Sequence, residues 1–230
     1  MKILAVADEE CSALWDYCTP GKLKEYDLIL SAGDLKADYL SFLVTMARSP
    51  LMYIHGNHDA GYAHCPPEGC DCIDDKLVIY KGLRILGLGG CHQYRPGAHQ
   101  FTEKQMRKRI RKLRAALQLA GGVDVVLAHA APLGMGDGED MAHRGFEAFV
   151  NLIENWHPGY FLHGHLHLNY GADLPRMNEC PGTKVIICCD RYVLELDVAP
   201  AEKWSFGKRL CKLFVKMIQF VNPICCIVYT

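Results

Sequence analysis

The stretch Gly56-Asn57-His58-Asp59 follows directly on the apolar run 51–54, and it decides how the rest of the chain is interpreted. A strand that ends in a glycine, an amide, an imidazole and a carboxylate delivers polar side chains to the carboxyl edge of a sheet, where open α/β sheets bind their ligands. A Gly-Asn turn that makes its own hydrogen bonds is the simpler interpretation of these four residues. The same pattern recurs four more times along the chain, and this recurrence favours a functional site.

Four other short apolar runs also end in polar side chains, and each has the length of a buried strand. The polar residues at the five ends are Asp8 and Glu10, Asp34, Asn57 and His58, His129, and His165 and His167. Oxygen and imidazole donors gathered in one place suit Mn²⁺, Fe²⁺ or Zn²⁺. All of these except His58 are candidate ligands, and seven ligands are too many for one ion, but two ions that share a carboxylate would use them all.

Helices are predicted between these strands. Apolar residues at helical spacing indicate helices over residues 36–48 and 102–119, and a third helix is expected after Gly145. Thr102 and Gln105 have the spacing of a capping box at the start of the second helix. Its basic face is interpreted as a solvent-exposed helix face.

Two hairpins are predicted after residue 60. The first joins residues 77–80 and 83–88 through Lys81-Gly82. The second, over residues 185–196, turns at Asp190-Arg191.

Composition limits the class of protein. The chain has 230 residues, half of them hydrophobic, and a formal net charge of −1 from 25 basic and 26 acidic residues. This balance disfavours long nucleic acids as partners, although it leaves room for a local basic patch. The N-terminal apolar run stops too early for a signal peptide, and no run reaches the ~18 residues of a membrane span. We therefore expect a cytoplasmic protein without a transmembrane segment.

The twelve cysteines are interpreted as reduced and mostly buried. Cys65, Cys70 and Cys72 leave two alternatives open, a metal knuckle or a disulfide pair, but their uneven spacing and the lack of an obvious fourth ligand argue against a separate zinc site.

The ordered motifs resemble those of the calcineurin-like metallophosphoesterases. The motifs are Asp-x-Glu at 8–10, Gly33-Asp34, Gly56–Asp59, a histidine after a strand at 129, and Gly-His-x-His at 164–167. The resemblance covers residues 1–197, and the small bacterial phosphodiesterases of this family look most similar in size. It implies an α/β fold with four layers, an α/β/β/α sandwich around two central mixed β-sheets. The expected organisation is a domain over 1–200 and an amphipathic C-terminal helix or tail over 201–230.

The resemblance also implies a role for each motif residue. Asp34 would bridge two divalent metals, Mn²⁺ or Fe²⁺ with Zn²⁺ as an alternative. Asp8 and His167 would complete the shell of one metal. The ligands of the other would be Asn57, His129 and His165. The nucleophile would be a metal-bridging hydroxide, available near neutral pH because the ions lower the pKa of the water.

Two residues are expected to act on the ester rather than on the metals. His58 would face the phosphate and either protonate the leaving oxygen or stabilise its charge, and Asp59 would orient His58. Contacts to the substrate phosphate are expected from His92, His143 and Arg144, with a structural role as the alternative for each. His163 is expected to support the site or the fold.

Glu10 is a departure from the family pattern, which usually has Asp-x-His at the first motif. A glutamate still binds a hard cation through oxygen, and its added negative charge would shift the preference toward Mn²⁺ or Fe²⁺. The same change would equally weaken that metal position, so both outcomes stay open.

Two functions from different classes follow. The first is a hydrolase that cleaves a phosphodiester or phosphomonoester in a small substrate. The second is a non-catalytic protein-interaction scaffold of the same fold, which has no need of an imidazole at position 58. The apolar stripe over 203–221 has three interpretations: packing on the domain, contact with a second copy or a partner, or binding to a membrane surface.

Overall fold

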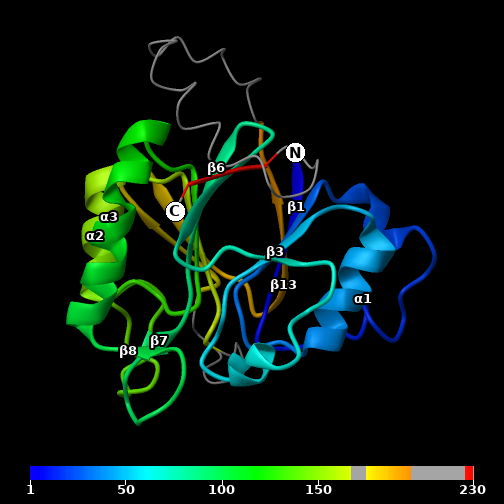
Figure 1. Ribbon diagram of the computed structural model, residues 1–230, viewed down its shortest axis with the longest axis horizontal. Helices are drawn as coiled ribbons and strands as arrows, with labels where there is room; N and C mark the ends of the chain where they lie inside the picture. The colour runs from blue at the N-terminus through cyan, green and yellow to red at the C-terminus, as the bar shows by residue number, and fades with distance from the viewer. Residues whose placement is uncertain (167–174, 198–225, 230) are drawn as a thin grey trace.

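The computed structural model describes residues 1–166, 175–197 and 226–229. Two mixed β-sheets lie face to face at its centre, with helices on both outer sides (Figure 1). This arrangement is the predicted four-layer α/β/β/α sandwich. The predicted ligand His167 and the predicted helix over 203–221 lie outside the described residues.

The first sheet has five strands in the order β13-β1-β2-β3-β4. Strands β1 to β4 run parallel, and β13 is antiparallel to β1. The bounds are Lys2–Ala7 for β1, Leu28–Ser31 for β2, Leu51–Tyr53 for β3, Asp71–Cys72 for β4 and Asp190–Glu195 for β13. Helix α1, Ala37–Ala47, covers the outer face, and the short 3₁₀ helices η1, Lys22–Glu25, and η2, Asp59–Ala63, lie in the connecting loops.

The second sheet has seven strands in the order β11-β12-β10-β9-β6-β5-β14. Their bounds are Met177–Cys180 for β11, Thr183–Ile187 for β12, Tyr160–His163 for β10, Val125–Ala128 for β9, Leu83–Leu88 for β6, Lys76–Tyr80 for β5 and Cys226–Tyr229 for β14. Strands β12, β10, β9 and β6 are parallel, and β5 forms the predicted antiparallel hairpin with β6. Strand β14 pairs with the outer edge of β5.

Helices α2, Glu103–Ala120, and α3, Glu147–Trp156, cover the outer face of the second sheet (Figure 1). The predicted capping box is present, because Gln105 N–H donates to Thr102 Oγ1 at 3.3 Å and Thr102 N–H donates to Gln105 Oε1 at 2.7 Å. A small parallel pair, β7 at Cys91–His92 and β8 at Gln100–Phe101, precedes α2.

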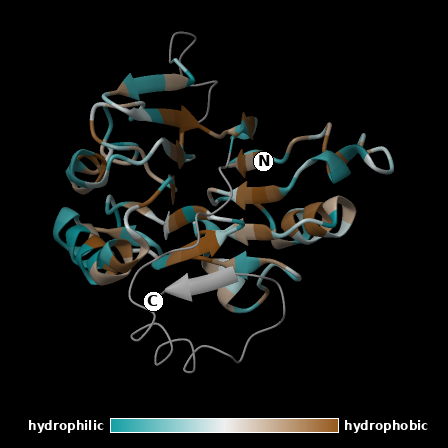
Figure 2. Ribbon diagram, turned by 90° about the horizontal axis from the view of Figure 1, so that it is seen from above, coloured by the Kyte–Doolittle hydropathy of each residue, from teal (hydrophilic) through white to brown (hydrophobic). Residues whose placement is uncertain are grey.

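The core has three apolar layers, as a four-layer sandwich requires. One lies between the two sheets, where residues such as Leu30 and Leu127 are fully buried. A second fills the space between the five-stranded sheet and α1, and a third lies under α2 and α3. The strands are accordingly the most hydrophobic elements in Figure 2.

The predicted hairpin over 185–196 is wrong. Residues 183–187 form β12 in the seven-stranded sheet, whereas 190–195 form β13 in the five-stranded sheet, antiparallel to β1. The chain therefore passes from one sheet to the other through Cys188-Cys189. Both segments are short, apolar and able to pair with any neighbouring edge, so their pattern did not distinguish a hairpin from a crossing between sheets.

Candidate metal centre

Three predicted ligands meet where strands of both sheets end. Asp34 follows β2, His129 follows β9, and His165 follows β10. Each offers one ligand atom, and these atoms lie within 4.8 Å of one another. Asp34 and His165 have φ values of 58° and 66°, in the left-handed region that residues other than glycine rarely occupy. Strain of this kind is typical of functional sites.

Backbone carbonyls fix the orientation of both imidazoles. Nδ1 of the fully buried His129 lies 2.8 Å from the carbonyl oxygen of Ala32, so this nitrogen carries a proton and donates. Nε2 of His165 donates in the same way to the carbonyl of Ala142 at 2.8 Å. The remaining nitrogens, Nε2 of His129 and Nδ1 of His165, are the two that can bind a metal. Such carbonyl contacts are usual behind metal-ligating histidines.

The charges in this cluster are those of a ligand set. Burial raises the pKa of the Asp34 carboxyl, but the His129 ring and the His58 N–H outweigh burial and hold that pKa at about 2. Burial lowers the pKa of His165 to about 3, so its ring is neutral. An anionic carboxylate and a neutral imidazole are the forms that bind divalent metals.

His129 holds a proton where a metal would bind. Burial lowers the pKa of its ring, but Asp34 overcomes this effect and raises the pKa to about 9. His129 Nε2 lies 3.3 Å from Asp34 Oδ2 and 3.0 Å from Asn57 Oδ1, and both oxygens accept from the protonated ring. If this proton is removed, His129 Nε2, Asp34 Oδ2 and Asn57 Oδ1 are three donor atoms placed to bind a cation.

Asp8 and two glycines complete the frame. The Asp8 carboxylate accepts from the N–H of His165 at 2.9 Å and 3.0 Å, which ties the end of β1 to the end of β10. A Cβ on Gly164 would lie 2.7 Å from Asp8 Oδ2, and a Cβ on Gly56 would overlap the Asp34 carboxylate. Both positions therefore need glycine for the carboxylates to keep their places.

Asp59 supports the site in a different way from the one predicted. Its buried carboxylate accepts from the N–H of Gly56 at 2.7 Å and from the N–H of Asp34 at 2.8 Å. These contacts hold the two motif loops together, whereas the His58 ring is exposed. The His58 N–H donates to Asp34 Oδ1 at 2.8 Å, so the Asp34 carboxylate holds the His58 backbone in place.

The ring of His58 faces an open cleft of about 620 Å³ beside the cluster. Asp8, Glu10, Asp34 and Lys36 also line this cleft. The Glu10 carboxylate lies 3.2 Å from Lys36 Nζ, an ion pair that the sequence pattern did not predict. Glu10 is thus at the cleft, with a cation beside it that offsets its extra charge.

The three residues predicted to contact substrate lie in two places. His143 is beside the centre, with its ring 5.0 Å from that of His165 and its Nδ1 2.7 Å from Asp140 Oδ2. The exposed Arg144 follows it. His92 lies farther along, where its ring stacks on Phe146 at 4.4 Å and its Nε2 is 3.7 Å from Glu103.

His163 is buried behind the centre. Its Nδ1 lies 3.0 Å from the carbonyl oxygen of Gly164, and its Nε2 has no hydrogen-bond partner among the described residues.

A second cluster of ligand-type side chains lies elsewhere on the same sheet edges and was not predicted. His55, Asp74 and His99 bring ligand atoms within 4.8 Å of one another. Nδ1 of His55 lies 2.8 Å from Asp74 Oδ2, and the rings of His55 and His99 stack at 4.4 Å. Arg109 donates to the other oxygen of Asp74 at 2.9 Å.

The nine cysteines whose side chains the structure describes are free thiols, including Cys65, Cys70 and Cys72. None of the helices within the described ranges combines the length and apolar character needed to cross a bilayer.

Two curated proteins are similar to this chain in sequence. A lariat debranching enzyme from Caenorhabditis briggsae is 28% identical over a match that covers 68% of this chain and 41% of that enzyme. A UPF0046 protein from Caenorhabditis elegans is 23% identical over 64% of this chain and 58% of its own length. The chain thus spans about half the length of these relatives. No family model matches it.

Solved structures with the same fold are more distant in sequence. TT1561 of Thermus thermophilus aligns with a TM-score of 0.57 and 15% identity, covering 82% of this chain and 89% of that one. Another crystal structure aligns with a TM-score of 0.59 and 13% identity over 84% of this chain and 94% of its own. These two alignments show that the chain has the fold of those solved structures, and its ordered motifs resemble those of the calcineurin-like metallophosphoesterases.

Proposed function

We propose that the protein is a metal-dependent hydrolase of phosphoric esters. The observation that carries this proposal is the meeting of Asp34, His129 and His165 beside an open cleft, with ring nitrogens of both histidines left for a cation. The likeness to a lariat debranching enzyme supports a phosphodiester as the substrate.

The proposed ligands are divided between two divalent ions, Mn²⁺ or Fe²⁺, with Zn²⁺ as the alternative. Asp34 is the shared carboxylate. The other proposed ligands are Asp8, Glu10, Asn57, His129, His165 and His167. When bound, such a pair of ions activates water and neutralises charge on the phosphoryl group.

The protein's own side chains do the remaining work. His58 stands exposed at the cleft, next in the chain to the ligand Asn57, and its imidazole gives a proton to the leaving oxygen. Asp59 keeps the His58 backbone in place through the two loops that it joins. The His143 ring lies 5.0 Å from that of His165, and His143 and the following residue, Arg144, hold the ester's phosphate oxygens.

The test is hydrolysis of bis-p-nitrophenyl phosphate with added Mn²⁺ by the wild type, His58→Ala and His64→Ala. His64 is an exposed histidine at the end of η2, so its variant is a matched control. We expect metal-dependent activity that falls by about 100-fold or more in His58→Ala and is unchanged in His64→Ala.

Equal activities in the three proteins would remove His58 from the chemistry. A wild type that binds metal and hydrolyses none of a panel of diesters and monoesters would favour the scaffold function instead.

A further inference from the structure

Positive charge is concentrated on helix α2, although the whole chain has a net charge of −1. The helix contains seven lysine or arginine residues and the single acidic residue Glu103. Arg107 pairs with Glu103 and Glu147, and Arg109 pairs with Asp74 and Asp75. The other five form no ion pair with any described residue: Lys104, Lys108, Arg111, Lys112 and Arg114. The near-neutral total therefore conceals a strongly basic surface.

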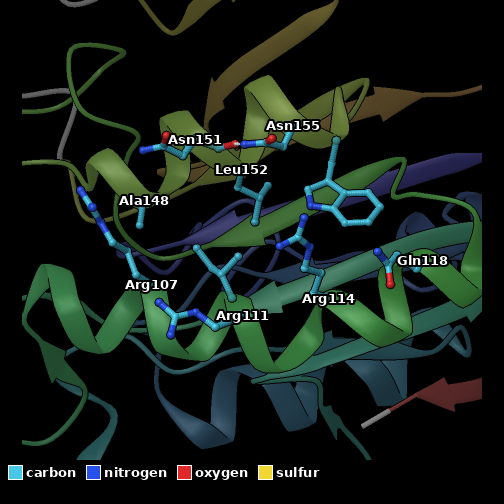
Figure 3. A pocket seen from close by; sticks show the side chains of 10 residues that line it. Arg107, Arg111, Arg114, Gln118, Ala148, Asn151, Leu152 and Asn155 are labelled. Atoms are coloured by element: carbon cyan, nitrogen blue, oxygen red, sulfur yellow. Dashed lines mark hydrogen bonds between the residues drawn. The ribbon is translucent and has the colours of Figure 1, made fainter.

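Part of this charge lines a groove between α2 and α3 of about 370 Å³. Arg107, Arg111 and Arg114 lie along one side of the groove, spaced as successive turns of α2 (Figure 3). They span about 10 Å of the helix axis. A guanidinium is the side chain best suited to bind phosphate through two parallel hydrogen bonds.

The α3 residues that line the opposite side of the groove include polar and aromatic side chains. Asn151 and Asn155 lie one turn apart on α3 (Figure 3), and Trp156, the last residue of α3, also lines the groove. Amide groups can bond base edges, and an indole offers a face on which a base stacks. A basic helix face that is only solvated needs neither of these groups opposite its arginines.

Arg107, which lines the groove, is linked through neighbouring side chains to the loop after β9. Arg107 Nε donates to Glu103 Oε1 at 3.0 Å, and Glu103 Oε2 lies 3.7 Å from His92. The His92 ring stacks on Phe146, two residues after Arg144. A chain of contacts thus connects the arginines to the loop that carries His143 and Arg144.

We propose that the α2–α3 groove binds single-stranded nucleic acid. Arg111 and Arg114 hold successive phosphates, and Trp156 stacks on a base. The strand extends past Arg107 toward the metal centre. The idea that this nucleic acid is the substrate rests on the proposed hydrolase function. The idea that the groove binds it does not.

The test measures binding without hydrolysis. A fluorescein-labelled single-stranded RNA of about 20 nucleotides is titrated with the full chain in EDTA, and its fluorescence anisotropy is followed at several salt concentrations. The groove variant is Arg111→Glu/Arg114→Glu. The matched control is Lys108→Glu/Lys112→Glu, which makes the same charge change on the same helix at exposed positions outside the groove.

We expect the groove variant to bind at least about tenfold more weakly than the control near physiological salt. Loss of two phosphate contacts should also reduce the slope of log affinity against log salt by about 1.4. Trp156→Phe should bind better than Trp156→Ala, since phenylalanine keeps a stacking face. Thermal unfolding of each variant confirms that it is folded.

Three outcomes would overturn the proposal. The first is no RNA binding by the folded wild type. The second is equal loss in groove and control variants, which would show an unlocalised basic face. The third is groove-dependent binding to vesicles of phosphatidylcholine and phosphatidylserine that exceeds binding to RNA, which would assign the groove to a membrane surface. Because EDTA removes metal from the assay, failure here and failure of the hydrolase are separate results.

Discussion

The metal centre and the His55 cluster contain the same side chains, one carboxylate and two imidazoles within 4.8 Å, but differ in how the carboxylate is satisfied. Asp34 faces the Nε2 of His129, where a cation can replace a proton. Asp74 has an arginine among its partners: its Oδ1 accepts from Arg109 and the Gly89 N–H, and its Oδ2 accepts from His55.

The difference teaches that ligand type and spacing do not by themselves define a metal site. A guanidinium 2.9 Å from Asp74 supplies the positive charge that a metal would supply, and it repels a second cation. We therefore interpret the His55 cluster as an ion-paired support that joins β3, the start of β5 and α2.

The largest expected effect is at Asp34. Asp34→Asn should remove at least one equivalent of bound metal and lower esterase activity by about 1000-fold, because the shared charged oxygen is lost. Isothermal titration with Mn²⁺ counts the equivalents. Asp38→Asn, an exposed carboxylate in the first turn of α1, is the control and should change neither quantity. Two full equivalents in Asp34→Asn would refute the bridging role.

The second largest effect is expected at Asp74, and it concerns stability rather than metal binding. Asp74→Asn should leave metal stoichiometry unchanged and reduce the free energy of unfolding by about 3 kcal/mol, since Arg109 loses a partner in a largely buried ion pair. Chemical denaturation measures the loss. If this variant instead lost a metal equivalent without losing stability, the two clusters would have to be regarded as two metal sites.

The third effect is a pH dependence that belongs to the metal centre. The His129 pKa, about 9, lies above its ordinary 6.5. In metal-free protein its stabilisation is complete below 6.5 and is lost as pH rises through 9. A metal must displace this proton, so metal affinity should rise by up to about tenfold per pH unit toward pH 9.

Calorimetry at several pH values between about 6 and 8 measures this dependence. A metal affinity that does not change with pH would show that no proton is displaced from the centre. The comparison cluster differs in that no metal displaces its proton. Hydrogen bonds to Asp74 and Cys72 raise the His55 pKa from 6.5 to about 10, so the stability that this proton contributes is complete below 6.5 and is lost as pH rises through 10, with or without metal.

The smallest effect is at His99. His99→Ala removes a ring stacked on His55 and should reduce the free energy of unfolding by about 1 kcal/mol. Bound Mn²⁺ and Zn²⁺, measured by elemental analysis, should equal the wild-type amounts. Fewer equivalents of either ion would contradict the ion-paired interpretation of this cluster.

The meeting of Asp34, His129 and His165 was largely predictable because parallel strands carry their following residues to one edge. Asp34, His129 and His165 each come directly after an apolar run, so their meeting follows from the sheet topology. The supporting contacts were not predictable in the same way. The Ala142 carbonyl behind His165 and the Lys36 cation beside Glu10 depend on loop paths, which no short-range pattern specifies.

The second cluster and the crossing between the sheets were missed for related reasons. His55, Asp74 and His99 lie in three segments whose proximity depends on tertiary packing. Residues 185–196 contain two apolar segments, as a hairpin does, but each segment pairs with a strand from another part of the chain. A pattern of apolar residues identifies a strand and leaves its partner undetermined.

The crossing at Cys188-Cys189 has a consequence for synthesis of the chain on the ribosome. Strand β1 is made long before its neighbour β13, which ends at Glu195, so one edge of β1 stays unpaired until β13 has emerged. An exposed apolar strand edge is prone to pair wrongly with other chains. The nascent protein therefore depends on late residues to protect its first strand, and truncation before β13 should yield aggregates rather than a smaller folded domain.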